Sequence, residues 1–181
     1  MPPDFSTTAL RRLLVAWLWL ALSGTAAVAQ AQGLSEYRLK AAFLYNFAQF
    51  TEWPAAVGST LNLCVYGQDP FGAELDGLHG RAAGPRSIAV QRKSSTDTLK
   101  GCQIVFIAPS AIGNVARVLN ALDGLPVLTV SDSPGALRNG VALNMVVVQD
   151  RITFEANLPA TRAARLSLSS KLLRVASEVL Q

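Results

Sequence analysis

The segment Ile104-Val105-Phe106-Ile107-Ala108 is the clearest indication of the fold, because all five of its residues are apolar. A strand with one face in water alternates apolar and polar residues, whereas a strand covered on both faces is apolar throughout. A helical pattern follows: Ser110 is a candidate N-cap, and apolar residues recur at helical spacing from Ile112 to Leu122. The stretch therefore predicts a strand inside a parallel sheet that helices cover on both faces.

Three more runs have strand character, at residues 61–66, 88–91 and 127–130. Each is followed by a helix or loop long enough to cross back to a parallel neighbour. After the first of them, Asp69 and Pro70 are suited to the N-cap and first position of a short helix. We expect a single three-layer α/β domain with a mostly parallel sheet flanked by helices.

The last third of the chain has a different pattern. Residues 141–148 and 152–157 are rich in β-formers and enclose the polar pair Gln149-Asp150, which predicts an antiparallel hairpin at one edge of the sheet. A long closing helix is expected to begin at Pro159. Its apolar stripe would consist of Ala164, Leu168, Leu172, Val175 and Val179.

A helix is predicted from an N-cap at Ser35 to about Thr51, where Trp53-Pro54 ends it. One side carries Leu39, Phe43, Phe47 and Phe50. The other side, with Tyr37, Ala41, Leu44 and Ala48, is also mostly apolar. Such a helix is either enclosed within the domain or offers one face to another molecule.

Residues 1–29 have the pattern of a cleaved secretory signal peptide. Arg11 and Arg12 supply the positive charge, residues 13–22 the apolar core, and Ala27-Val28-Ala29 the cleavage site. The apolar core is shorter than the roughly 20 residues that span a bilayer, although a retained membrane anchor is the alternative. We expect a periplasmic protein whose mature domain covers residues 30–181.

Two cysteines, Cys64 and Cys102, lie in the mature region. An exported protein reaches an oxidising compartment, where a structural disulfide between them is the expected state. Two buried thiols that never meet are the alternative, because the sequence does not give the distance between them.

The chemistry available to the chain argues against an enzyme. The single histidine, His79, lies in a Gly-Leu-His-Gly turn and is interpreted as a solvated loop residue. One histidine and two separated cysteines do not supply a zinc site, and no cofactor is expected. The net charge is +4 and the basic residues are scattered, which does not favour nucleic acid.

Two groups of polar residues are candidate ligand contacts. Asp69, Ser131 and Asp132 follow predicted strands and would lie at the carboxyl edge of the sheet, where α/β proteins bind ligands. Arg162 and Arg165 give the predicted closing helix a basic face that suits an anion or a docking partner. Turn capping and a solvated face are the alternatives for the two groups.

Six segments, in order, resemble the YfiR family of periplasmic regulators. They are KAAFLYNFAQFTEWP at 40–54, CVYGQDPFG at 64–72, GCQIVFI at 101–107, LTVSD at 128–132, FEANL at 154–158 and SSKLLRVA at 169–176. No single segment is specific, but together they extend over nearly all of the mature chain. This sequence departs from some family members in having no second cysteine pair between residues 135 and 157.

The resemblance implies a periplasmic repressor that binds the sensor region of an inner-membrane diguanylate cyclase and holds that enzyme inactive. Its release would raise cyclic di-GMP and favour biofilm formation, and the protein would meet the membrane only through its partner. The first predicted helix and its flank supply the candidate docking residues for the cyclase or a second copy of the chain: Tyr37, Leu44, Tyr45, Phe50 and Trp53. The alternative is a periplasmic sensor module that binds a small anion at the carboxyl edge.

Overall fold

The computed structural model describes residues 25–181, and the chain divides into Met1–Glu36 and Tyr37–Gln181. The folded domain is the second part, Tyr37–Gln181. The charged and apolar portions of the predicted signal peptide, residues 11–22, lie outside the described residues. Between Thr25 and Gln181, none of the helices is both long and apolar enough to cross a membrane.

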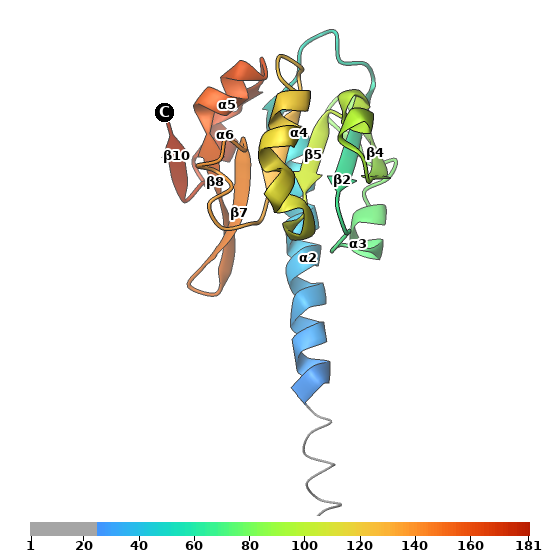
Figure 1. Ribbon diagram of the computed structural model, residues 1–181, viewed down its shortest axis with the longest axis vertical. Helices are drawn as coiled ribbons and strands as arrows, with labels where there is room; N and C mark the ends of the chain where they lie inside the picture. Colours follow the sequence, from blue (N-terminus) through green and yellow to red (C-terminus); the bar gives the residue numbers. More distant parts are fainter. Residues whose placement is uncertain (1–24) are drawn as a thin grey trace, which may run out of the picture. The chain divides into compact units, whose positions relative to one another are not determined.

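An eight-stranded sheet forms the centre of the domain, in the order β10-β8-β7-β6-β5-β2-β4-β3 (Figure 1). Strands β4, β2, β5, β6 and β7 are parallel, whereas β8 runs antiparallel to β7 and β3 antiparallel to β4. The strands are β2 Thr60–Tyr66, β3 Ala82–Ala83, β4 Arg86–Lys93, β5 Ile104–Ile107, β6 Leu128–Ser131, β7 Leu143–Val148, β8 Arg151–Asn157 and β10 Glu178–Leu180. The four predicted parallel strands and the hairpin are confirmed.

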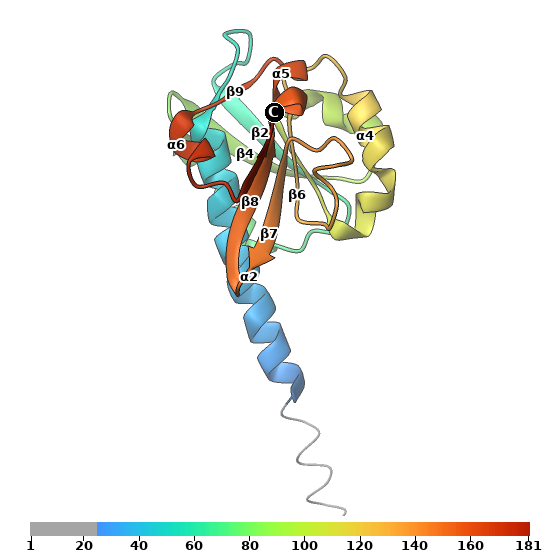
Figure 2. The same ribbon diagram turned by 90° about the vertical axis from the view of Figure 1, so that its left-hand side faces the viewer.

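Helices cover both faces of this sheet, which confirms the three-layer architecture. Helix α2 runs from Thr25 to Phe50, and its part from Tyr37 onward lies on one side of the sheet, opposite helix α4 (Val115–Ala121) (Figure 2). The fully apolar β5 serves both sides: Ile104 and Phe106 belong to the core cluster under α2, and Val105 and Ile107 to the cluster under α4. The remaining helices are α3 Ala73–Asp76, α5 Leu158–Ala163 and α6 Ser170–Leu173, with 3₁₀ helices η1 Thr96–Gly101 and η2 Pro109–Asn114.

The long closing helix predicted from Pro159 is wrong. The chain forms α5, then β9 (Ser167–Leu168), then α6 and β10. Arg165 has a φ of 55°, which ends α5, and β9 pairs with β1 (Thr51–Glu52) in a separate two-stranded sheet. Beyond α6, β10 pairs parallel with β8, so the predicted hairpin lies one strand inside the sheet edge.

Three predicted helix caps are also corrected. Ser35 lies inside α2, because the segment from Thr25 is rich in helix-forming Ala and Gln and contains no proline. The N-cap of α3 is Gly72, while Asp69 Oδ1 accepts a hydrogen bond from the Phe71 amide in the preceding turn. Ser110 caps no helix, and its Oγ accepts a hydrogen bond from the amide of Gln68 in the neighbouring loop.

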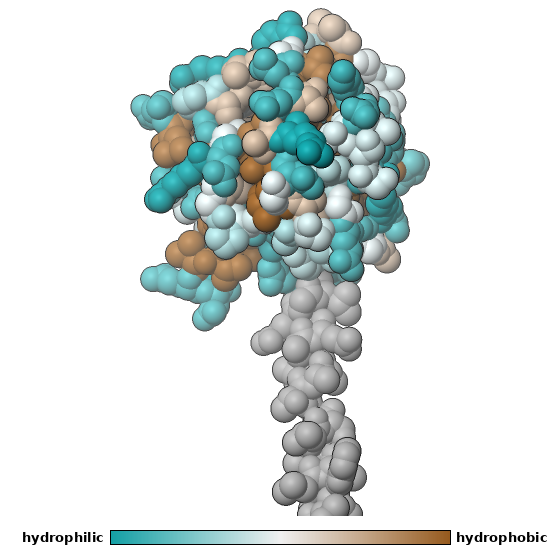
Figure 3. Space-filling model, viewed as in Figure 1, coloured by the Kyte–Doolittle hydropathy of each residue, from teal (hydrophilic) through white to brown (hydrophobic). Residues whose placement is uncertain are grey.

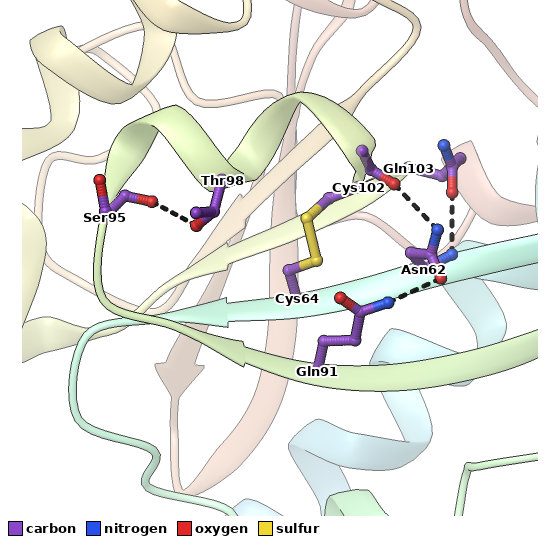
Figure 4. Close-up of a disulfide and its surroundings, with 8 residues drawn as sticks. Asn62, Cys64, Gln91, Ser95, Thr98, Cys102 and Gln103 are labelled. Atoms are coloured by element: carbon purple, nitrogen blue, oxygen red, sulfur yellow. Dashed lines mark hydrogen bonds between the residues drawn. A yellow bond between two sulfur atoms is a disulfide. The ribbon is translucent and has the colours of Figure 1, made fainter.

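Cys64 and Cys102 form a disulfide that joins β2 to the end of η1, with 6.0 Å between their Cα atoms (Figure 4). Both residues are buried, so the predicted bond is confirmed as part of the core under α4. Asn62 holds the same junction from the side: it donates to the Gly101 carbonyl at 2.9 Å, and its side-chain oxygen accepts from Gln91 at 2.9 Å.

Candidate functional site

The carboxyl edge of the parallel strands is the first candidate site. Tyr66, Ile107 and Ser131 are aligned in the strand register and end β2, β5 and β6. Between β2 and β5 the strand order reverses, because β4 lies on one side of β2 and β5 on the other. The loops that leave the two strands therefore part toward opposite faces of the sheet, and ligands of open α/β sheets bind in the crevice this creates.

A cavity of about 240 Å³ occupies this position. The lining residues come from α2, from the loop after β2 and from the start of η2: Tyr37, Gln68, Asp69, Pro70, Pro109 and Ser110. The two loops touch at Gly67, whose φ is 101°. A Cβ on Gly67 would lie 2.8 Å from that of Ala111, so this approach requires glycine.

Beside the cavity, Asp132 is the centre of a buried polar cluster. Lys40 Nζ lies 2.7 Å from Asp132 Oδ2, and the side chains are 5% and 1% exposed. The hydroxyl of Tyr37 donates to the same oxygen at 3.0 Å. The other oxygen, Oδ1, is buried and accepts no hydrogen bond within the described chain. Such a pair fixes α2 against the end of β6, since separating the two charges inside the protein is costly.

Asp69, at the rim of the cavity, is held by Arg92 of β4. The guanidinium donates to Asp69 Oδ2 through Nε at 2.9 Å and through Nη2 at 2.8 Å. Arg92 also bonds Asp76, and that hydrogen bond is the main cause that raises the Arg92 pKa above its ordinary value. One arginine thus serves two carboxylates and keeps the loop after β2 in place.

The predicted ligand residues are divided by the fold. Asp69 and Asp132 lie at the carboxyl edge, while the hydroxyl of the buried Ser131 donates to the Ile107 carbonyl at 3.0 Å. Arg162 and Arg165 are exposed near the opposite edge, because β8 runs antiparallel to β7 and leads into α5 there. The Arg165 side chain donates to the carbonyl of Gly124, ahead of β6.

The predicted docking residues of the first helix are largely used inside the domain. Leu44 is fully buried. The Tyr45 hydroxyl donates to the Ala82 carbonyl, and the Trp53 indole donates to the Ala48 carbonyl. Phe50 is partly buried against the core. Of the two alternatives for this helix, enclosure holds for Leu44, since both sides are apolar and packing decides which is covered. Docking through the other four residues stays a prediction.

An exposed apolar surface lies elsewhere, and sequence reasoning missed it. Its most exposed members are Leu39 of α2 at 52%, Val147 of β7 at 55% and Val175 after α6 at 63%. A groove of about 150 Å³ lies between α2 and α6. We call it the α2–α6 groove; it is lined by Phe43, Asn46, Phe50, Phe154, Lys171, Leu172 and Val175. Figure 3 shows further apolar surface gathered on the β7–β8 hairpin.

Candidate metal ligands do not assemble within the described chain. No three His, Cys, Asp or Glu side chains among residues 36–181 are grouped so that they could hold a metal ion. His79 is exposed in its turn, where Nδ1 accepts a hydrogen bond from the Val90 amide at 3.3 Å. Its position tethers the turn to β4.

Comparison with known proteins identifies the family. The model of the YfiR/HmsC-like family matches residues 37–177, nearly all of the second part of the chain. The chain belongs to the YfiR/HmsC-like family. This match covers all six segments on which the sequence resemblance rests, and no curated protein matches the chain.

Two solved structures match the chain at low sequence identity. A conserved domain protein from Vibrio cholerae O1 biovar El Tor matches with a TM-score of 0.50 and 8% identity, over 77% of this chain and 59% of the other. The ABC domain from Streptococcus pneumoniae, in complex with L-Trp, matches with a TM-score of 0.47 and 8% identity, over 67% and 55%. The chain thus spans less than two thirds of either structure, and the first supports the α/β fold alone.

Proposed function

We propose that this member of the YfiR/HmsC-like family is a periplasmic regulatory protein that acts by binding. Its partner is the sensor region of an inner-membrane diguanylate cyclase, which it holds inactive, so that cyclic di-GMP and biofilm formation stay low. Family membership supports regulation, and the resemblance of the six segments supports the kind of partner. The catalytic step belongs to the cyclase.

The observation that carries the proposal is the exposed apolar surface around the α2–α6 groove. Leu39 lies one helical turn before Phe43, so the two share a side of α2. Phe43 packs against Phe154 of β8 with ring centroids 6.0 Å apart. Val147 is two residues from Met145, the cross-strand partner of Phe154, and therefore faces the same way. These residues continue the buried core outward, as expected of a surface that a partner covers.

Charge around the groove indicates the chemistry of the partner segment. Lys171 lines the groove, and the exposed Arg174 immediately precedes Val175. A segment that inserts an apolar side chain between α2 and α6 and carries carboxylates beside it would match both features. Apolar contacts at the centre would supply affinity, and the charges at the rim would guide orientation.

The test is capture of the cyclase from detergent-solubilised inner membranes of the same organism on the immobilised protein. We expect mass spectrometry to identify a diguanylate cyclase in the captured material. Leu39→Ser combined with Val175→Ser should reduce its recovery about tenfold, because two central apolar contacts are lost. Val148→Ser is the matched control, since Val148 is comparably exposed but faces away from the groove side of the hairpin.

Two results would count against the proposal in different ways. Capture of no diguanylate cyclase by the unchanged protein would remove the proposed function. Equal capture by the double variant and by Val148→Ser would retain the function but exclude this surface. Repeating the capture with a reductant asks in addition whether the buried Cys64–Cys102 disulfide affects binding.

A further inference from the structure

We propose that the carboxyl-edge cavity between the loops after β2 and β5 is a binding site for a small organic ammonium compound. This goes beyond the proposed docking function and uses a different surface. The cavity of about 240 Å³ lies where the strand order reverses, and its walls come from three separate parts of the chain. A ligand there would contact α2 and both loops at once.

Three of the six lining residues carry rings, which form the apolar part of the wall. Tyr37, Pro70 and Pro109 give three ring surfaces, and the Tyr37 ring is itself fixed edge-on to Phe71, with centroids 5.2 Å apart. Gly67, which precedes the lining residue Gln68, brings the two loops into contact. Walls of this kind suit the flat or compact apolar body of a small molecule.

The sign of the expected charge follows from the polar groups. None of the six lining residues is a cation. The neighbouring Lys40 pairs with Asp132, and the neighbouring Arg92 is shared between Asp69 and Asp76. Arg92 supplies one positive charge to two carboxylates, so this group keeps a negative charge, and an anion would find no cation of its own among the lining residues. This reverses the expectation of a small anion from the sequence.

Hydrogen-bonding capacity points the same way. Asp69 Oδ1 accepts from the Phe71 amide alone among the described groups, and a carboxylate oxygen can accept a second donor. Asp69 therefore offers the site an unused acceptor position, and an ammonium group supplies a donor together with a positive charge.

The experiment uses two probes of similar size and opposite charge, phenethylamine and phenylacetate, with inorganic phosphate as a third. Each is titrated into the protein purified as it is secreted, and binding is followed by backbone amide NMR. We expect phenethylamine to shift the amide signals of Gln68 and Ser110 in a saturable manner. Phenylacetate and phosphate should leave these signals unchanged.

A pair of matched variants tests whether the lining carboxylate is responsible. Asp69→Asn keeps the oxygen that accepts from Phe71 but removes the charge, and it should weaken phenethylamine binding about tenfold. Asp76→Asn also removes one negative charge that pairs with Arg92. Because Asp76 does not line the cavity, this variant should leave the affinity for phenethylamine within about twofold. The amide spectra also report whether each variant is folded.

Three outcomes would overturn the inference. Saturable shifts with phenylacetate or phosphate, and none with phenethylamine, would show an anion site. No shift at Gln68 or Ser110 with any probe would exclude a site in this cavity. Equal weakening by Asp69→Asn and Asp76→Asn would show a general charge effect. None of these results bears on capture of the cyclase, which uses the α2–α6 groove.

Discussion

The two faces of the central sheet are stabilised by different means. Under α2, aromatic rings form two short chains of contacts: Phe71 meets Phe106 edge-on in one, with centroids 4.8 Å apart, and Phe47 meets Phe154 edge-on in the other, at 5.1 Å. Under α4, the covering elements are two 3₁₀ helices and a seven-residue helix, and a disulfide crosses the core. The disulfide restricts the unfolded chain, and it therefore adds stability to the face of the sheet that only short helices cover.

The largest effect is expected from removing a ring on the α2 face. Phe47 is fully buried, so Phe47→Ala should lower the free energy of unfolding by about 4 kcal/mol through lost burial and a remaining cavity. Urea denaturation followed by circular dichroism measures this. A loss below about 1 kcal/mol would mean that the aromatic chain is not the main support of this face.

The buried ion pair on the same face should give the next effect. Lys40→Met leaves Asp132 buried without its cation and should cost about 3 kcal/mol. Lys40→Met combined with Asp132→Leu should recover most of that loss, because no unpaired charge remains. If the double variant is no more stable than the single one in the same urea titration, the charge pairing is not the cause.

On the opposite face, the disulfide can be removed without changing the core volume greatly. Cys64→Ala combined with Cys102→Ala should lower the free energy of unfolding by about 2.5 kcal/mol, mainly by freeing the unfolded chain. The native protein should resist mild reductant, since both cysteines are buried. Rapid reduction of the folded protein, measured by thiol labelling, would show that the α4 face opens readily.

The smallest of the four effects is expected where the loops from the two faces meet. Gly67→Ala places a Cβ against Ala111 and Ser110 at a φ of 101°, and should cost about 2 kcal/mol. Gly84→Ala is its control, because Gly84 also has a positive φ but has open space around it. Comparison of the Tm of the two variants separates the effect of the close contact at residue 67 from the effect of backbone strain. Equal shifts in Tm would show that strain alone accounts for the loss.

Prediction from the sequence succeeded for strands that are buried on both faces, because their apolar pattern can be read from consecutive residues. Residues 104–108 are all apolar, and a strand covered on both faces buries every side chain. Strand β5 covers four of these five residues. Prediction failed after Pro159, where the apolar spacing suits a helix but the chain forms separate elements of two to six residues. There, pairing of Ser167–Leu168 with Thr51–Glu52 and of Glu178–Leu180 with β8 prevailed over helical spacing.

The candidate sites divide in the same way. Local sequence patterns were enough to predict that Asp69 and Asp132 follow parallel strands, and therefore that they reach one edge of the sheet. Only the tertiary structure brought Tyr37 and Lys40 onto Asp132, across 95 and 92 residues of chain. It also decided which side of α2 is covered and left Leu39 and Val175 exposed. Strand runs are set by neighbours in sequence, whereas charge pairing and exposed faces depend on which distant elements pack together.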